Sequence, residues 1–139
     1  MLNISDNSIS NTGLKLITAG FDAAPNKEIV SINLSHNDLI GVEAIENLGS
    51  LLDYSSKLIS LNLSENKIGD AGIELLSKAF NENKSRLSKL YMSNVEGTLA
   101  GFKTLFTALR ANQHLTHLVL NGNSFKTPPR FSKEQLRKA

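Results

Sequence analysis

The 139-residue chain contains neither cysteine nor tryptophan, and it has only three prolines. Without cysteine it can form no disulfide, no thiolate metal site and no cysteine nucleophile. No apolar run reaches the length of about 18 residues that a membrane-spanning helix needs. No charged N-terminal region followed by an apolar core marks a secretory signal. These absences fit a reducing compartment, and we expect a cytoplasmic location.

Leucine and asparagine are unusually frequent, with 22 and 15 residues. Charge is uneven: residues 1–96 carry 8 Lys/Arg and 12 Asp/Glu, whereas residues 97–139 carry 7 Lys/Arg and one Asp/Glu. The basic C-terminal end could attract a membrane surface through its anionic headgroups, although a solvated tail is the simpler interpretation. Nucleic acid is a less suitable partner, because no aromatic residues interleave the positive charges.

A pattern of the form L-x-x-L-x-L-x-x-N-x-L recurs along the chain. It reads LNISDNSI (a partial copy) at 2–9, IVSINLSHNDL at 29–39, LISLNLSENKI at 58–68 and LTHLVLNGNSF at 115–125. The asparagines are spaced by 30, 29 and 57 residues, so the long gap predicts another copy near residue 95. Residues 87–97, LSKLYMSNVEG, supply it, with Val95 at the asparagine position and Gly97 at the last apolar one.

This pattern resembles the leucine-rich repeat, whose unit is 20–29 residues long. Leucines alternating along a strand share one face, and stacked copies bury that face in a continuous core. The resemblance implies an α/β fold: a right-handed solenoid arc of about five units, with a parallel sheet on the concave side and helices on the convex side. We expect repeats over 1–127, with units starting near 1, 29, 58, 87 and 115.

Apolar residues at four-residue spacing follow the first four copies and predict helices packed on the sheet. The stripes are Gly13-Ile17-Phe21, Ala44-Leu48-Leu52, Gly72-Leu76-Phe80 and Gly101-Leu105-Leu109. The small first residue of each stripe should let its helix start close to the strands, and Asp70 is predicted to cap the third helix. Pro128 and Pro129 prevent such a helix in the fifth unit. Residues 128–139 are therefore predicted to form a tail with a short helix from about Lys133.

The pattern asparagines stand where each strand turns away from the sheet. Their amides can bond backbone groups of neighbouring turns that would otherwise be buried and unpaired. We therefore predict a structural ladder formed by Asn7, Asn37, Asn66 and Asn123. Val95 cannot take part, so the ladder should be interrupted or locally bent there.

Catalytic and metal-binding constellations are weak in this sequence. His114 and His117 have H-x-x-H spacing but lack a third ligand, and His36 and Glu65 share a position of adjacent units as polar residues on one face often do. There is no G-x-S-x-G motif and no phosphate-binding glycine loop. We expect no enzyme activity, no cofactor, no metal and no small-molecule substrate.

The residues between the leucines should line the concave face. In the first three units they are mostly Asn and Ser, which predicts a neutral, solvated floor; the last two units present Lys89, Tyr91, His117 and Val119. Tyrosine beside valine and cations is typical of an interface centre. We predict that these four residues bind a protein partner, with strand propensity alone as the alternative explanation of Tyr91 and Val119.

Longer stretches indicate a subfamily. The repeat with a full helix is similar to the ribonuclease-inhibitor-like class, and residues 61–80, 87–94 and 108–125 resemble CARMIL-type actin-regulatory scaffolds. Tropomodulin-like and NOD-like receptor repeats share most of these motifs. The resemblance implies a non-enzymatic scaffold that is part of a larger intracellular protein, with actin regulation in the CARMIL-type case. The alternative is the recognition-repeat portion of a multidomain enzyme or microbial effector whose catalytic domain is absent.

The first unit begins in mid-strand at Leu2, without the polar end unit that normally shields a solenoid core. We therefore expect the chain to be a piece of a longer arc. Its open N-terminal end, with Leu2, Ile4 and Ile9, should favour self-association.

Overall fold

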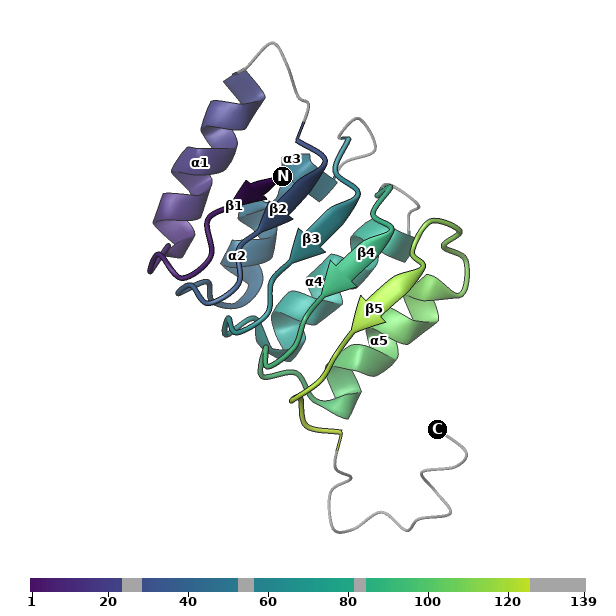
Figure 1. Cartoon of the computed structure of the whole chain (residues 1–139). Helices are drawn as coiled ribbons and strands as arrows, with labels where there is room; N and C mark the ends of the chain where they lie inside the picture. Colours follow the sequence, from purple (N-terminus) through teal and green to yellow (C-terminus); the bar gives the residue numbers. More distant parts are fainter. Residues whose placement is uncertain (24–28, 53–56, 82–84, 126–139) are drawn as a thin grey trace, which may run out of the picture.

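The computed structural model of the chain describes residues 1–23, 29–52, 57–81 and 85–125. The elements are β1 (Leu2–Asn3), α1 (Asn11–Ala23), β2 (Ser31–Asn33), α2 (Gly41–Asn47), α3 (Gly49–Leu52), β3 (Ser60–Asn62), α4 (Gly69–Asn81), β4 (Lys89–Tyr91), α5 (Leu99–Leu109) and β5 (His117–Val119). The strands form one parallel sheet in chain order, and the helices lie together behind it (Figure 1). The chain is thus a right-handed α/β solenoid arc. The tail 128–139, with the helix predicted from Lys133, lies outside the described residues.

The strands pair so that each repeat position meets its counterpart in the next unit. Ile32 pairs with Leu2 and with Leu61, and Leu90 pairs with Leu61 and with Leu118. Because register is preserved across all five strands, side chains of one repeat position form columns that run across the sheet.

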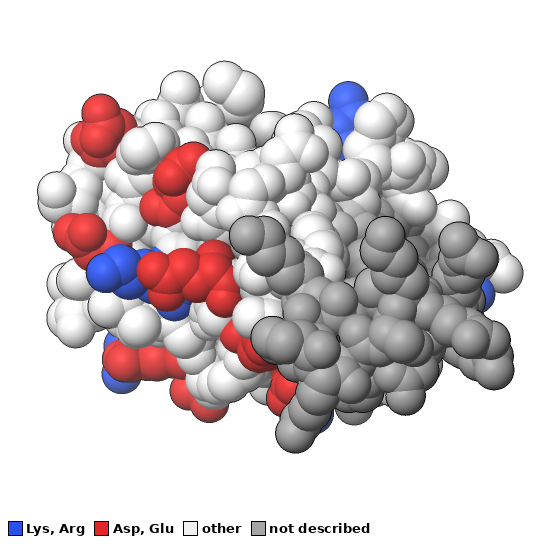
Figure 2. All heavy atoms as spheres, turned by 90° about the horizontal axis from the view of Figure 1, so that it is seen from below, with Lys and Arg blue, Asp and Glu red and all other residues white. Residues whose placement is uncertain are grey.

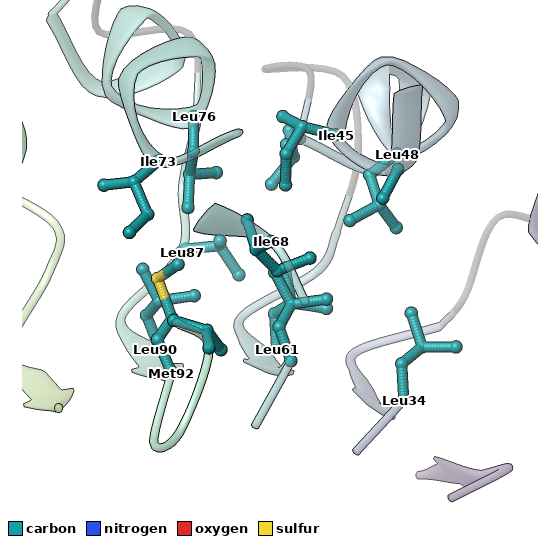
Figure 3. Close-up of a cluster of buried hydrophobic side chains, with 14 of the residues drawn as sticks. Leu34, Ile45, Leu48, Leu61, Ile68, Ile73, Leu76, Leu87, Leu90 and Met92 are labelled. Atoms are coloured by element: carbon teal, nitrogen blue, oxygen red, sulfur yellow. The ribbon is translucent and has the colours of Figure 1, made fainter. Parts of the chain in front are cut away.

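Side chains of the strands that face the helices build the core, as Figure 3 shows. Leu61, Leu90 and Met92 are 0 % exposed, and Ile73 and Leu76 of α4 meet them from the helix layer. Burying a side chain of this size is favourable by about 1.5–3 kcal/mol relative to leaving it in water. The core therefore runs as one layer between sheet and helices, and neighbouring units hold each other in place.

The helical stripes face this core as their spacing predicts. Most of their apolar members are buried, whereas Ile17 and Phe21 in α1 and Leu109 in α5 are half-buried, since these helices flank the array. A Cβ atom on Gly101 would lie 3.0 Å from the Asp70 Cα, which agrees with the close helix approach expected for small residues. The second unit differs from the prediction: its helix is divided into α2 and α3, because the Leu48 N–H donates to the Ile45 carbonyl (3.1 Å) in a tighter turn.

The fourth unit fills its core in another way. Val95 is 0 % exposed, so the residue at the asparagine position packs inside. A Cβ atom on Gly97 would lie 2.4 Å from Phe102 Cε2 and 2.6 Å from Ile73 Cδ1. Phe102 of α5 therefore occupies the space at this position, where other units place Leu39 or Ile68.

The prediction that Asp70 caps α4 is wrong. Asp70 lies inside the first turn of α4, and its carboxylate accepts hydrogen bonds from the Thr98 backbone N–H (2.7 Å) and the Thr98 hydroxyl, just before α5. Asn11 of α1 makes an equivalent link, accepting from the Ile40 N–H (3.0 Å) and donating to the Ile40 carbonyl (2.9 Å) before α2. These side chains tie the start of one helix to the start of the next.

Candidate functional site

The strand face opposite the helices is open in the part of the chain that the structure describes (Figure 1). The apolar residue of each strand, a leucine or Ile32, points into the core. Counted from the first leucine of the pattern, the residues at the third, fifth and seventh positions therefore point the other way. This concave face is where the structure places the predicted binding residues.

All four predicted binding residues lie side by side. Lys89 pairs in register with His117, and Tyr91 pairs with Val119. Lys89 and His117 are exposed, while Tyr91 and Val119 are half-buried. They form a contiguous surface, called here the concave patch, in which two apolar and two basic side chains adjoin. Its role in binding stays a prediction.

The asparagines of the first three strands are more than a solvated floor. Asn33 Oδ1 accepts hydrogen bonds from the Ser35 N–H (3.0 Å) and the Ser35 hydroxyl (2.6 Å), and Asn62 Oδ1 accepts one from the Ser64 N–H (3.0 Å). Such a bond to the backbone two residues ahead turns the chain out of the strand. This column therefore has a structural role that its residue types do not reveal.

Tyr91 occupies the same column but cannot make that bond. Here the Ser93 N–H donates instead to Ser64 Oγ of the neighbouring unit, at 3.0 Å. A serine from β3's unit thus replaces the missing asparagine. The turn after β4 therefore forms without a hydrogen bond from the Tyr91 side chain.

Three of the four asparagines predicted to form the ladder, Asn37, Asn66 and Asn123, join neighbouring units. Asn37 Oδ1 accepts from the Asn7 and Ile9 N–H groups (3.0 and 2.9 Å), and its Nδ2 donates to the Leu34 and Ile4 carbonyls (2.9 and 3.1 Å). Each buried amide therefore joins its own turn to the preceding one.

Two further asparagines repeat this arrangement. Asn66 accepts from the Leu39 N–H (3.1 Å) and donates to the Leu34 carbonyl (2.9 Å), and Asn123 accepts from the Val95 N–H (3.0 Å) and donates to the Met92 carbonyl (2.8 Å). The prediction differs from the structure at Asn7, whose exposed side chain donates to the Ser5 carbonyl of its own unit, while its backbone N–H is bound by Asn37.

The ladder is interrupted at Val95, as the sequence predicts. The Asn66 and Ile68 N–H groups face no carboxamide there, unlike their counterparts Asn7 and Ile9. The sheet is nevertheless unbroken, since β3 and β4 keep their register. Outside the sheet, Asn94 Nδ2 donates to Glu65 Oε1 at 2.5 Å and links the same two turns.

One backbone feature of the turns was not predicted. In every unit the residue just before the pattern asparagine, or before Val95 in the fourth unit, has a positive φ. The values are 57° at Asp6, 55° at His36, 60° at Glu65, 51° at Asn94 and 74° at Gly122. This left-handed conformation is uncommon outside glycine. It lies in the turn that follows every strand, and no motif of residue types in this column predicts it.

Charge differs between the two ends of the strands. Figure 2, seen from below, shows acidic side chains gathered on the side toward which the strand arrows of Figure 1 point. The turns after the strands carry the exposed acidic residues Asp6, Asp38, Glu65 and Glu96, which outnumber the exposed Lys67 in the same turns. Lys89 and His117 stand at the opposite end, as the first residues of β4 and β5. The concave face is therefore basic where the strands start and acidic beyond their ends.

Other surfaces of the described residues are less distinctive. An open groove between α4 and α5 on the convex side is lined mainly by polar residues, among them Glu74, Lys78 and Lys103. No three His, Asp or Glu side chains in the described ranges are close enough to hold a metal ion. None of the helices described here has the length and apolar character to cross a membrane.

Comparison with known proteins gives matches over most of the chain. The family model described as Leucine Rich repeat matches residues 2–17, 54–77 and 111–127. The chain is 32 % identical over 127 residues to NACHT, LRR and PYD domains-containing protein 3 of Macaca mulatta and 31 % identical to that of Homo sapiens. It is 34 % identical over 122 residues to NACHT, LRR and PYD domains-containing protein 14 of Mus musculus. These matches cover 88 % of the chain but only 12 % of each relative.

Proposed function

Because the chain is a leucine-rich repeat protein, we propose that it is a protein-interaction region that binds a partner through the concave patch. Leucine-rich repeats are recognition modules built on a fixed scaffold, with variable residues on the strand face. The names of the relatives combine such repeats with NACHT and PYD domains, and the chain covers 12 % of their length. We infer that it acts as the recognition part of a larger protein.

The replacement of asparagine by Tyr91 carries the assignment to this patch. Asn33 and Asn62 use their amides to turn their strands, whereas the turn after β4 is held by Ser64. A half-buried tyrosine there contributes nothing to the turn but offers a large, rigid contact surface. Val119 beside it enlarges the apolar area, and Lys89 and His117 form its polar rim.

The proposal includes a cytoplasmic location and the absence of catalysis by the chain. Actin regulation is a narrower proposal that depends on the resemblance of residues 61–80, 87–94 and 108–125 to CARMIL-type scaffolds, and a ribonuclease-inhibitor-like class depends on the full helix of each repeat. A multidomain enzyme or effector could use the same recognition surface, and sequence flanking the repeats would separate these cases. Self-association at the N-terminal end remains a proposal, as does membrane binding through the basic end, whose residues 126–139 lie outside the described ranges.

The test compares Tyr91→Ala with Phe106→Ala in affinity capture from a cell extract. Phe106 is an exposed aromatic residue on α5, on the other side of the molecule, and is 41 % exposed. Partners of the concave patch should be lost with Tyr91→Ala and retained with Phe106→Ala. The unfolding temperature of Tyr91→Ala should stay nearly unchanged, since surface substitutions usually alter stability by about 0.5 kcal/mol or less. Equal capture by both variants would refute the assignment.

A further inference from the structure

The side chains of the concave patch are spaced like those of a short extended peptide. Lys89 and His117 are register partners on β4 and β5, as are Tyr91 and Val119. Neighbouring strands lie about 4.8 Å apart, and residues two apart along a strand lie about 6.6 Å apart. The four side chains therefore mark a rectangle with an apolar pair at one end and a basic pair at the other.

An extended partner segment fits the long side of this rectangle. Its residues i and i+2 face the same way and are also about 6.6 Å apart. If the segment runs along β4 and β5, one of these side chains lies over Tyr91 and Val119, and the other lies over Lys89 and His117. A segment that crosses the strands would have to match a spacing of about 4.8 Å and would fit less well.

Charge sets which side chain belongs at which end. Lys89 and His117 are exposed, and the residues of the same column in β2 and β3 are the neutral Ser31 and Ser60. Glu65 is exposed in the turn beyond β3, at the other end of the strands. A partner carboxylate is therefore favoured where the strands start and disfavoured where they end.

We propose that the concave patch recognises an extended protein segment in which an acidic side chain stands two residues from a large apolar one. The acidic side chain lies over Lys89 and His117, and the apolar side chain packs against Tyr91 and Val119. This inference rests on the proposed function, because it names the partner chemistry of the same surface.

The test is selection from a displayed library of random peptides with the whole chain as bait. The baits are wild type, Lys89→Glu, Tyr91→Ala and the control Lys103→Glu. The control makes the same charge change at an exposed position of α5, away from the concave face. Wild type and Lys103→Glu should enrich peptides with Asp or Glu two residues from Phe, Leu, Ile or Met by at least about tenfold over the input. Lys89→Glu should select Lys or Arg at the acidic position, and Tyr91→Ala should lose the enrichment. Circular dichroism and thermal unfolding verify that each bait is folded.

The outcomes separate this inference from the proposed function. Peptides that depend on Tyr91 but show no acidic preference, or a preference that Lys89→Glu leaves unchanged, overturn the inference and leave the binding surface in place. Acidic and apolar residues enriched three or four positions apart indicate a helical ligand and also overturn it. Selection of no peptides, or of peptides that bind Tyr91→Ala equally well, argues against both.

Discussion

The third and fourth units are adjacent and pair in perfect register, yet they hold their turns by different means. The third unit uses Asn66, which is 2 % exposed and bonds backbone groups of the second and third units. The fourth has Val95 at this position and fills the space beside Gly97 with Phe102. The comparison teaches that a continuous core can keep units stacked where one polar link is missing, because the sheet and the apolar layer still join them.

The same two units differ on the concave face. Asn62 turns its own strand, while Tyr91 leaves that task to Ser64 of the preceding unit. Because a neighbouring unit supplies the hydrogen bond for this turn, the fourth unit can carry a residue other than asparagine at this position. The irregular unit contributes Lys89 and Tyr91 to the concave patch, for which we propose a binding role.

The strongest test of this comparison removes the ring on which the fourth unit depends. Phe102→Ala should lower the free energy of unfolding by about 3–5 kcal/mol, because it opens a cavity in the core next to Gly97. Phe106→Ala on the same helix should cost far less, since that ring is 41 % exposed. Urea denaturation followed by circular dichroism measures both. Similar losses would show that Phe102 has no special part in the core.

A second change breaks the polar link of the third unit. Asn66→Ala should cost about 1–3 kcal/mol, because the Leu39 N–H and the Leu34 and Leu63 carbonyls lose a buried partner. The exposed Asn7→Ala is the matched control and should change stability by about 0.5 kcal/mol or less. If the two variants unfold at the same urea concentration, the ladder contributes no measurable stability.

A third change concerns the contact between the two units at their helix starts. Asp70→Ala removes the acceptor of the Thr98 N–H and hydroxyl and should cost about 1 kcal/mol, as loss of a capping side chain does. Glu74→Ala, one turn later on the exposed face of α4, serves as control. The thermal unfolding temperature of Asp70→Ala should be lower than that of Glu74→Ala. The reverse order would contradict a stabilising role of this link.

The smallest effect is expected when the fourth unit is made to resemble the third. Val95→Asn loses buried apolar surface but supplies a carboxamide to the Asn66 and Ile68 N–H groups. The two contributions oppose each other, so we expect a net change in stability of about 1 kcal/mol or less. A loss of several kcal/mol in urea denaturation would mean that the turn of the fourth unit cannot accept the amide.

Much of the fold could be predicted because its cause is periodic. Alternation of leucines placed the strands, four-residue spacing placed the helices, and the asparagines indicated the ladder and its gap at Val95. Contacts between particular side chains about one unit apart could not be predicted. The Asp70–Thr98 link joins two helix starts 28 residues apart, and the local sequence around Asp70 instead favoured a cap of its own helix.

The candidate site was predictable only in part, for the same reason. The phase of the repeat is enough to place Lys89, Tyr91, His117 and Val119 on one face, and the strand register confirms that placement. That Asn33 and Asn62 are structural, and that Ser64 substitutes for the missing amide next to Tyr91, depends on the orientation of side chains at the strand ends. From residue type alone, Asn33, Asn62 and Ser64 cannot be distinguished from ordinary polar surface residues.

The left-handed turn residues restrict how this protein can change its specificity. At such a φ a β-branched side chain is sterically disfavoured, and the five residues found there, Asp6, His36, Glu65, Asn94 and Gly122, include none. The turn column can therefore vary in charge, but only among side chains that the backbone tolerates. The third column sits on regular strands and accepts nearly any residue. The fifth column does so where another group replaces the asparagine that turns the strand, as Ser64 does beside Tyr91. Changes of binding partner should therefore arise chiefly from substitutions in those two columns. In the turn column, the backbone conformation limits which residue types can be used for recognition.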